Sequence, residues 1–251
     1  MKHIPNIFTL LNLVFGCIAI IFILQTGETL ITTGDQGNWV AQLPEKIWWG
    51  SVCIGLAAII DFLDGFVARL FNASSTLGKE LDSLADVVSF GVAPGLILYQ
   101  LLRISFIQED SGLDTNLWSL APALIFPCAG AYRLARFNTD PSQPYGFRGV
   151  PIPAAGLVVA SFPLILLYNY FGLTPILVNK WILYSVILVM SWLMISRFPM
   201  ISLKFRDYSI KNNTSKYILL ASSIIAAIFL QWLAVPVIFV LYVVLSLVSK
   251  K

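Results

Sequence analysis

Long apolar stretches recur along the whole chain, and they constrain the fold more than any other feature. They run over residues 7–24, 46–71, 82–101, 118–137, 152–170, 180–197, 217–232 and 235–249. A helix of about 20 apolar residues matches the thickness of a bilayer. Only 12% of the residues are charged, against about 25% in soluble domains. The sequence therefore predicts an all-α polytopic membrane protein with six core spans and two shorter C-terminal spans, which form a hairpin, a re-entrant pair or an interfacial element.

The first stretch, Ile7–Leu24, has a weak basic start and no small-residue cleavage pattern, so we interpret it as a retained span and not as a signal peptide. Orientation follows from the basic residues, which gather on the cytoplasmic side of membrane proteins. With the N-terminus in the cytoplasm, only Lys46, Arg103 and Lys180 among the lysines and arginines lie on the opposite side. This arrangement predicts that the loop 72–81 is cytoplasmic and that the basic segment 198–216 lies against anionic lipid.

Several function classes are excluded by composition. The net charge of +3 is too small to indicate a nucleic-acid partner. Cys17, Cys53 and Cys128 lie in apolar stretches without CxxC spacing, which is typical of small core residues. The single histidine, His3, lies near the N-terminus, where a solvated or headgroup-level role is expected. Catalysis by histidine and a zinc site are therefore not expected.

Four aspartates interrupt the apolar pattern in the segment DFLDGFVARLFNASSTLGKELDSLAD, which covers residues 61–86. A carboxylate inside a membrane helix costs about 2.5–3.5 kcal/mol, so such residues usually have a function. Asp61 and Asp64 share one helical face, and Asp82 and Asp86 share another. If the two helices pack antiparallel about a turn near residues 72–75, the four carboxylates converge about 10–17 Å from the cytoplasmic tip.

Four carboxylates cannot share a small volume as free anions unless their pKa values rise or divalent cations lie among them. Oxygen ligands without Cys or His favour Mg²⁺, Mn²⁺ or Ca²⁺ over zinc. A cluster of this size could hold two ions, as in phosphoryl transfer. Small residues nearby, Gly65, Ala68 and Gly78, would let a bulky ligand approach the helix backbone, although alone such residues more often indicate close helix packing.

The pattern Asp61-x2-Asp64-Gly65-x2-Ala68-Arg69-x8-Gly78-x3-Asp82-x3-Asp86 matches, without a departure, the signature of the CDP-alcohol phosphatidyltransferases. Within that family the chain resembles the bacterial-type phosphatidylserine synthases, on the softer patterns IPNIFTLLNLVFG, VSFGVAPG, YRLARFN and GFRGVPIPAAG. This second resemblance covers most of residues 4–160. The resemblance implies a six-helix catalytic core, a homodimer, two Mg²⁺ or Mn²⁺ ions and a CDP-linked lipid donor.

The resemblance also implies the chemistry. The donor would be CDP-diacylglycerol and the acceptor L-serine, and the products phosphatidylserine and CMP. Asp61, Asp64 and Asp82 would bind metal, while Asp86 would both contact a metal and take the proton from the hydroxyl of serine. This division of roles agrees with general-base catalysis beside divalent ions.

Further residues are expected to bind substrate. Arg69, by the family pattern, would contact the phosphate or nucleotide of the CDP-lipid. Gly65, Ala68 and Gly78 would make room for the cytidine, and Asp64 would also bind the CDP-lipid. Asn6 and Thr9, on one side of the first helix, would reach the nucleotide or, alternatively, cap that helix.

Arg133 and Arg136 lie three residues apart at a cytoplasmic helix end. Their guanidinium groups suit the carboxylate of serine or a phosphate, unless they only determine orientation.

Three alternatives stay open at this point. A related enzyme could use glycerol 3-phosphate or inositol phosphate as acceptor, and the donor could be CDP-archaeol. A metal or proton transporter could use the aspartates as a transit site, although a transporter is expected to have polar positions reaching both sides. We expect residues 1–200 to form the transmembrane catalytic core and residues 201–251 a cytoplasmic basic loop with a helical hairpin. The expected location is the bacterial cytoplasmic membrane, with the active site facing the cytoplasm.

Overall fold

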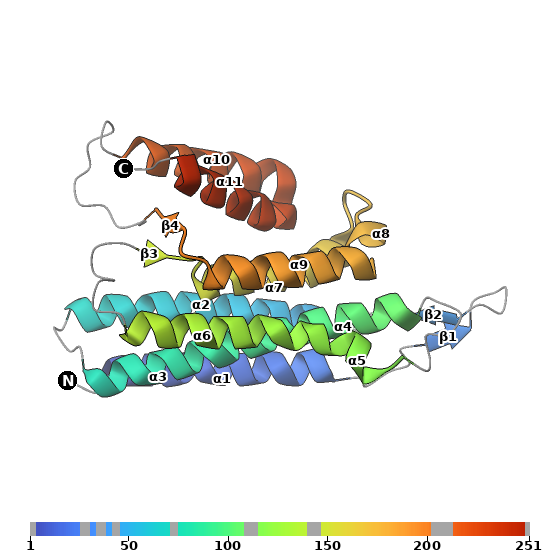
Figure 1. The fold of residues 1–251 in the computed structure, drawn as a ribbon, viewed down its shortest axis with the longest axis horizontal. Coiled ribbons are helices and arrows are strands. Elements are labelled where there is room, and N and C mark those ends of the chain that lie inside the picture. Colours follow the sequence, from blue (N-terminus) through green and yellow to red (C-terminus); the bar gives the residue numbers. More distant parts are fainter. Residues whose placement is uncertain are drawn as a thin grey trace.

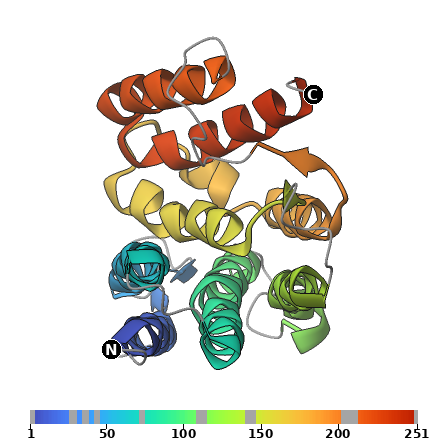
Figure 2. The ribbon, with the colours of Figure 1, turned by 90° about the vertical axis from the view of Figure 1, so that its left-hand side faces the viewer.

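A computed structural model of the chain describes residues 4–25, 31–33, 39–41, 46–70, 75–107, 115–139, 147–201 and 213–248. Within these ranges the fold is a bundle of long helices, with most of them running along its long axis (Figures 1 and 2). The expected all-α polytopic membrane fold is confirmed. Predictions that concern His3, residues 71–74 of the turn and residues 202–212 of the basic segment lie outside the described residues.

The first two helices form an antiparallel pair. They are α1 (Ile4–Leu24) and α2 (Ile47–Leu70), and a short antiparallel ladder of β1 (Ile31–Thr33) with β2 (Trp39–Ala41) lies between them in the sequence. Both helices are apolar, and their outer faces expose large side chains such as Ile21 and Ile59. In a membrane protein such exposed apolar faces are the surfaces that meet lipid. The inner faces pack closely, because a Cβ at Gly50 would lie 2.7 Å from the Ile23 side chain.

The third helical segment is the centre of the bundle. It is continuous from Thr76 to Ile107 and consists of α3 (Thr76–Asp86), the π-helical η1 (Val87–Val92) and α4 (Ala93–Ile107). Two-thirds of its most apolar window is buried (67%), against 28% for each of the first two helices. Close packing against α7 requires Gly156, where a Cβ would lie 2.7 Å from the carbonyl oxygen of Phe90.

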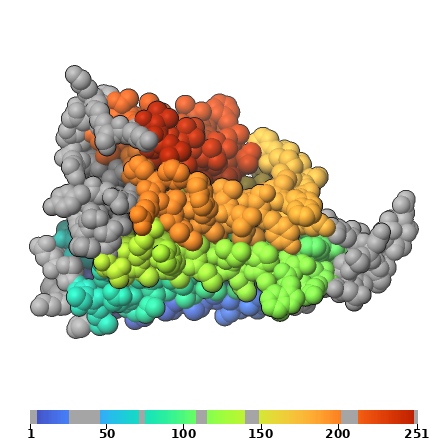
Figure 3. Space-filling view, in the orientation of Figure 1, coloured from blue at the N-terminus to red at the C-terminus, as the bar shows by residue number. Residues whose placement is uncertain are grey.

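The next helices cover one side of this centre, as Figures 2 and 3 show. A composite helix begins with α5 (Leu117–Leu120) and the 3₁₀ turn η3 (Ala121–Leu124), and it continues as α6 (Ile125–Thr139). Pro122 lies at the start of η3, where a proline is compatible with a tight turn. The bundle then continues through α7 (Ile152–Tyr168), the short α8 (Thr174–Leu177) and α9 (Lys180–Ile195), which packs along α6.

The last two helices form a hairpin on the α7 side of the bundle (Figure 1). They are α10 (Thr214–Leu230) and α11 (Ala234–Val248), joined by the 3₁₀ turn η5 (Gln231–Leu233). The chain reverses at Gln231, whose φ of 50° is rare for a residue other than glycine. The two helices pack against each other as a hairpin, and the way in which this hairpin lies in the membrane stays a prediction.

A short ladder connects this hairpin to the bundle. β3 (Phe147–Arg148) pairs with β4 (Pro199–Met200), and the next residue, Ile201, is bonded to α11. Its N–H donates to the Ser246 hydroxyl at 3.2 Å, and its carbonyl accepts from the Tyr242 hydroxyl at 3.2 Å. The hairpin is therefore attached to the bundle through polar contacts as well as through the apolar face of α7.

All eight predicted stretches are helical, but they do not all have the length of a full span. In the described part of the chain, four segments are long and apolar enough to cross a membrane: Pro5–Leu24, Ile47–Leu70, Thr76–Ile107 and Thr214–Val248, the last including the turn at η5. The helices α7 and α9 are apolar but shorter. The third helix also begins earlier than predicted, because α3 is amphipathic and its polar first turns lower the local hydropathy.

Candidate active site

The ends of α2 and α3 position the aspartates. Asp61 and Asp64 lie in the last turns of α2, and Asp82 and Asp86 lie in the second half of α3. Ser75 begins α3 as its N-cap, with a hydroxyl that accepts a hydrogen bond from the Gly78 N–H at 3.0 Å. A capping side chain of this kind bonds a backbone amide that otherwise has no partner at the start of a helix. It thereby fixes the residue at which α3 begins, and so the direction in which the carboxylates of α3 point.

Three of the four carboxylates form a tight group. One oxygen each from Asp61, Asp64 and Asp82 lies within 4.8 Å of the other two. Asp86, one helical turn beyond Asp82, is buried and interacts electrostatically with all three. The convergence expected from helical spacing is thus present, with three carboxylates in contact range and Asp86 beside them at the inner end.

The donor set fits divalent cations. The cluster offers only carboxylate oxygens, and Oδ1 of Asp82 and Oδ1 of Asp86 are buried without a hydrogen-bond partner. Buried oxygens of this kind are uncommon unless an ion or water meets them. Repulsion between the carboxylates would be relieved by a hard cation such as Mg²⁺ or Mn²⁺. Asp64 has a partner of its own, because the Thr9 hydroxyl donates to its Oδ2 at 2.7 Å.

A cavity of about 210 Å³ opens beside the cluster, between α1, α2 and the start of α3. The six predicted CDP-lipid residues Asn6, Thr9, Asp64, Gly65, Ala68 and Gly78 all line it, together with Pro5, Ser75, Lys79 and Asp82. The seventh, Arg69, is exposed at the end of α2 and is not part of the lining. A Cβ at Gly65 would meet no atom within 4 Å, which shows that the backbone there is open to the cavity.

Three lining residues, Pro5, Ser75 and Lys79, were missed by sequence reasoning. Ser75 lies at the turn and gives only a cap signal, while Lys79 follows the signature residue Gly78 directly. The Lys79 ammonium lies 5.9 Å from the centre of the Phe137 ring, so it also reaches toward α6. A basic residue next to a fixed glycine of a phosphate-transfer motif is the signal that could have identified it.

The π-helix η1 follows Asp86 directly and was not predicted. Its residues Ser89, Phe90 and Gly91 are buried, and the Ser89 hydroxyl donates to the carbonyl of Asn12 in α1 at 3.1 Å. A π-helical turn inside an α-helix is frequently found at a functional site. Here it lies between the aspartates of α3 and the packed core of α4.

Comparison with known proteins gives the family. A family profile described as CDP-alcohol phosphatidyltransferase matches residues 2–193, which include every residue of the cluster and the cavity. The chain belongs to the CDP-alcohol phosphatidyltransferase family. The family resemblance of the aspartate signature is thereby confirmed.

Three relatives share the name CDP-diacylglycerol–serine O-phosphatidyltransferase. A Bacillus subtilis protein of that name is 33% identical over 187 residues, which is 72% of this chain and 89% of the relative. One from Helicobacter pylori is 50% identical over 103 residues, 40% of each chain, and one from Methanocaldococcus jannaschii is 45% identical over 109 residues, 43% of this chain and 47% of the relative. The chain therefore spans less than half the length of the latter two.

Among the candidate residues of this family member, the two arginines of α6 have different surroundings. Arg133 is buried, its Nε has no hydrogen-bond partner, and its charge interacts with that of Asp86. Arg136 instead donates to two carbonyls at the end of α9, to Ile195 at 2.8 Å and to Ser196 at 3.1 Å. Only Arg133 faces the aspartates in this structure, and Arg136 joins α6 to α9.

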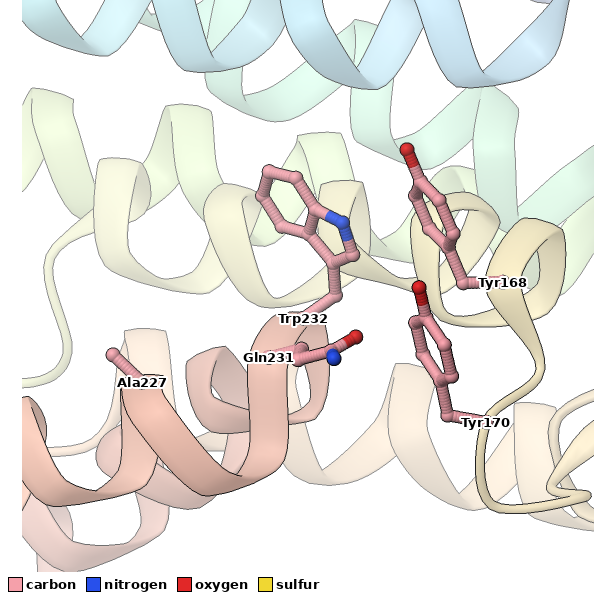
Figure 4. A pocket seen from close by; sticks show the side chains of 5 residues that line it. All are labelled: Tyr168, Tyr170, Ala227, Gln231 and Trp232. Carbon is pink, nitrogen blue, oxygen red and sulfur yellow. The ribbon is translucent and has the colours of Figure 1, made fainter.

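A second, larger hollow of about 450 Å³ lies near the C-terminal end of α7 and the turn at η5 (Figure 4). It is lined by Tyr168, Tyr170, Ala227, Gln231 and Trp232, and the two tyrosine rings stack with centroids 5.6 Å apart. The lining contains neither a carboxylate nor a cationic side chain. It therefore lacks the groups needed for metal-dependent phosphoryl chemistry, and the smaller cavity beside the aspartates is the candidate active site.

Proposed function

We propose that the chain transfers the phosphatidyl group of CDP-diacylglycerol to the hydroxyl of L-serine and releases CMP. The observation that carries this proposal is an aspartate cluster beside a cavity, with Asp64 and Asp82 in the cavity wall and six of the seven expected donor residues in its lining. The name shared by the relatives supports serine as the acceptor. Nothing comparable supports glycerol 3-phosphate, inositol phosphate or a transport function.

The cavity would hold the cytidine diphosphate of the donor. Gly65 and Gly78 carry no side chain, so the nucleotide could approach the backbone of α2 and α3 on either side of the cavity. Thr9 and Asn6 would contribute polar contacts from α1. Because the exposed faces of α1 and α2 are apolar, the acyl chains would stay in the lipid beside them.

Two Mg²⁺ or Mn²⁺ ions would be held by Asp61, Asp64, Asp82 and Asp86, and would supply positive charge to the diphosphate and to the oxygen that leaves with CMP. The chain itself contributes the placement of these carboxylates. Thr9 holds one oxygen of Asp64 and leaves the other available.

Asp86 would act as the general base. The serine hydroxyl attacks the phosphorus that carries diacylglycerol, the new O–P bond forms, and the P–O bond to CMP breaks. The proton of the hydroxyl passes to the Asp86 carboxylate. Arg133, which faces Asp86 from α6, would hold the serine carboxylate so that the hydroxyl lies beside the base. The Arg133 Nε has no hydrogen-bond partner within the described residues, so this donor is available for such a ligand.

We further propose that residues 1–200 form the catalytic unit and residues 201–251 a basic loop with the α10–α11 hairpin. The basic residues near the aspartate end favour a cytoplasmic orientation of the site, in the bacterial cytoplasmic membrane. By family resemblance the working form would be a homodimer.

The test is an assay with purified protein, CDP-diacylglycerol and Mn²⁺ or Mg²⁺. Parallel reactions contain L-serine, glycerol 3-phosphate or inositol phosphate, and CMP and the lipid product are both identified. Asp86→Asn removes the base, while Glu80→Gln removes an exposed carboxylate from the same helix and is the matched control.

CMP release that needs serine, is lost in Asp86→Asn and persists in Glu80→Gln supports the proposal. Release with a different acceptor would contradict serine and keep the family. Absence of metal-dependent release under every condition would contradict the phosphatidyl transfer as a whole.

A further inference from the structure

Asn12 in α1 is fully buried, with 0% of its surface exposed, and neither its Oδ1 nor its Nδ2 has a hydrogen-bond partner. Buried side-chain amides almost always have partners, so an unbonded one needs an explanation. The aspartate signature lies in α2 and α3 and does not include α1, so it assigns no role to Asn12. The explanation has to come from what surrounds this side chain.

Two hydrogen bonds fix where Asn12 lies. Thr9, one turn earlier on the same face of α1, bonds Asp64 at 2.7 Å. Because α1 and α2 are antiparallel, one turn deeper along α1 corresponds to one turn earlier in α2, at the level of Asp61. On the other side, the backbone carbonyl of Asn12 accepts the Ser89 hydroxyl at 3.1 Å. Asn12 therefore lies where α1, α2 and the α3–η1 junction meet.

Helix geometry gives the expected direction of the Asn12 side chain. In a helix the Cα–Cβ bond tilts toward the N-terminus, so the Asn12 amide extends from the level of Ser89 toward the cytoplasmic end. Asp86 lies three residues before Ser89, in that same direction. The approach of the two helices is close, because a Cβ at Gly16 would collide with Ser89.

The unbonded atoms on the two sides are complementary. Asn12 has a free amide donor, Nδ2, and Asp86 has a free buried acceptor, Oδ1. A neutral amide suits this position, because it orients a carboxylate without neutralising its charge as a lysine or arginine would.

We propose that Asn12 is a positioning residue for Asp86: its amide donates to one carboxylate oxygen and leaves the other directed toward the metal cluster and the acceptor hydroxyl. The structure does not contain this hydrogen bond, since both atoms lack a partner in it, and the proposal is that the bond forms in the metal-loaded site. The role of Asp86 as base rests on the proposed function, but the proposed hydrogen bond does not. Loss of a group that orients a metal-site carboxylate typically weakens metal affinity or activity about 10- to 100-fold.

The experiment compares Asn12→Leu with the unmodified protein. Leucine fills a similar volume without an amide. Asn12→Ala is the second variant, for the case that leucine does not fit. Ser89→Ala is the matched control, because it removes the bond to the Asn12 backbone and leaves the amide in place. Measured for each are Tm, the Kd for Mn²⁺ by calorimetry without substrate, and kcat and KM for serine.

The expected result for the Asn12 variants is an about 10- to 100-fold weaker Mn²⁺ affinity and a similar loss of kcat, with KM for serine and Tm unchanged or Tm higher, because an unsatisfied buried group has been removed. Ser89→Ala should keep Mn²⁺ affinity and kcat. Unchanged Mn²⁺ affinity and kcat in both Asn12 variants overturns the inference. A fall in Tm that accompanies the loss of affinity and kcat in both Asn12 variants also overturns it, because the loss then comes from a damaged fold. If the unmodified protein does not use serine, the proposed function fails, and the Mn²⁺ affinity of the Asn12 variants still tests the inference about Asn12.

Discussion

Gly65 and Gly55 provide a controlled comparison within α2. Each glycine has no atom within 4 Å of the position that a Cβ would occupy, yet only Gly65 lines the cavity beside the aspartates. Replacing a helical glycine by alanine favours the helix by about 1 kcal/mol. For a chain of this size that corresponds to a Tm higher by about 2–4 °C. Both Gly65→Ala and Gly55→Ala should therefore be slightly stabilised.

The two variants should differ in donor binding. If the nucleotide lies against the Gly65 backbone, a methyl group there over-packs the site, and over-packing costs about 1–3 kcal/mol. That is about a 5- to 150-fold higher KM for CDP-diacylglycerol, with KM unchanged in Gly55→Ala. Steady-state CMP release over a range of donor concentrations, together with a thermal melt, measures both effects. An unchanged donor KM in Gly65→Ala would refute the assignment of the cavity, and a lower Tm would refute the open space at Gly65.

Three further outcomes are expected. Thr9→Val removes the 2.7 Å hydrogen bond to Asp64, and because hydrogen bonds to charged groups contribute about 1.5–3 kcal/mol, kcat/KM should fall about 10- to 150-fold. Thr9→Ser should keep most of the kcat/KM of the unmodified protein, and an equal loss in both variants would contradict the role of the hydroxyl. Arg133→Met should raise KM for serine by about tenfold or more, while Arg136→Met should lower Tm with little change in KM, because Arg136 bonds backbone carbonyls at the end of α9. The reverse result would indicate that Arg136, and not Arg133, binds the acceptor. Chelation with EDTA should abolish CMP release, and Mn²⁺ or Mg²⁺ but not Zn²⁺ should restore it, because the cluster offers only oxygen ligands; activity that survives chelation would contradict a metal site.

The aspartate cluster could be predicted because it follows from periodicity alone. Asp61 and Asp64 share a face, Asp82 and Asp86 share another, and a short turn between two helices leaves only an antiparallel arrangement. The place of Asn6 and Thr9 beside the nucleotide site was an expectation from the family resemblance, with helix capping as the alternative, and both residues line the cavity.

Other features depend on contacts that no local pattern encodes. Arg133 and Arg136 are both basic and lie one turn apart, so the sequence could not tell that one faces Asp86 while the other bonds α9. A single asparagine in an apolar helix, such as Asn12, gives no periodic signal.

The π-helix between α3 and α4 has a geometrical consequence for how this helix could change over time. A π-helical turn accommodates one additional residue in an α-helix, and one residue corresponds to a rotation of about 100°. The face that carries Asp82 and Asp86 and the face of α4 that packs on α7 therefore do not keep the phase of one uninterrupted helix. Each end can be aligned with its own neighbours: the aspartates with α2, and α4 with the core. Deleting one residue within Val87–Val92 would restore a regular helix and would rotate the aspartates relative to everything that α4 contacts.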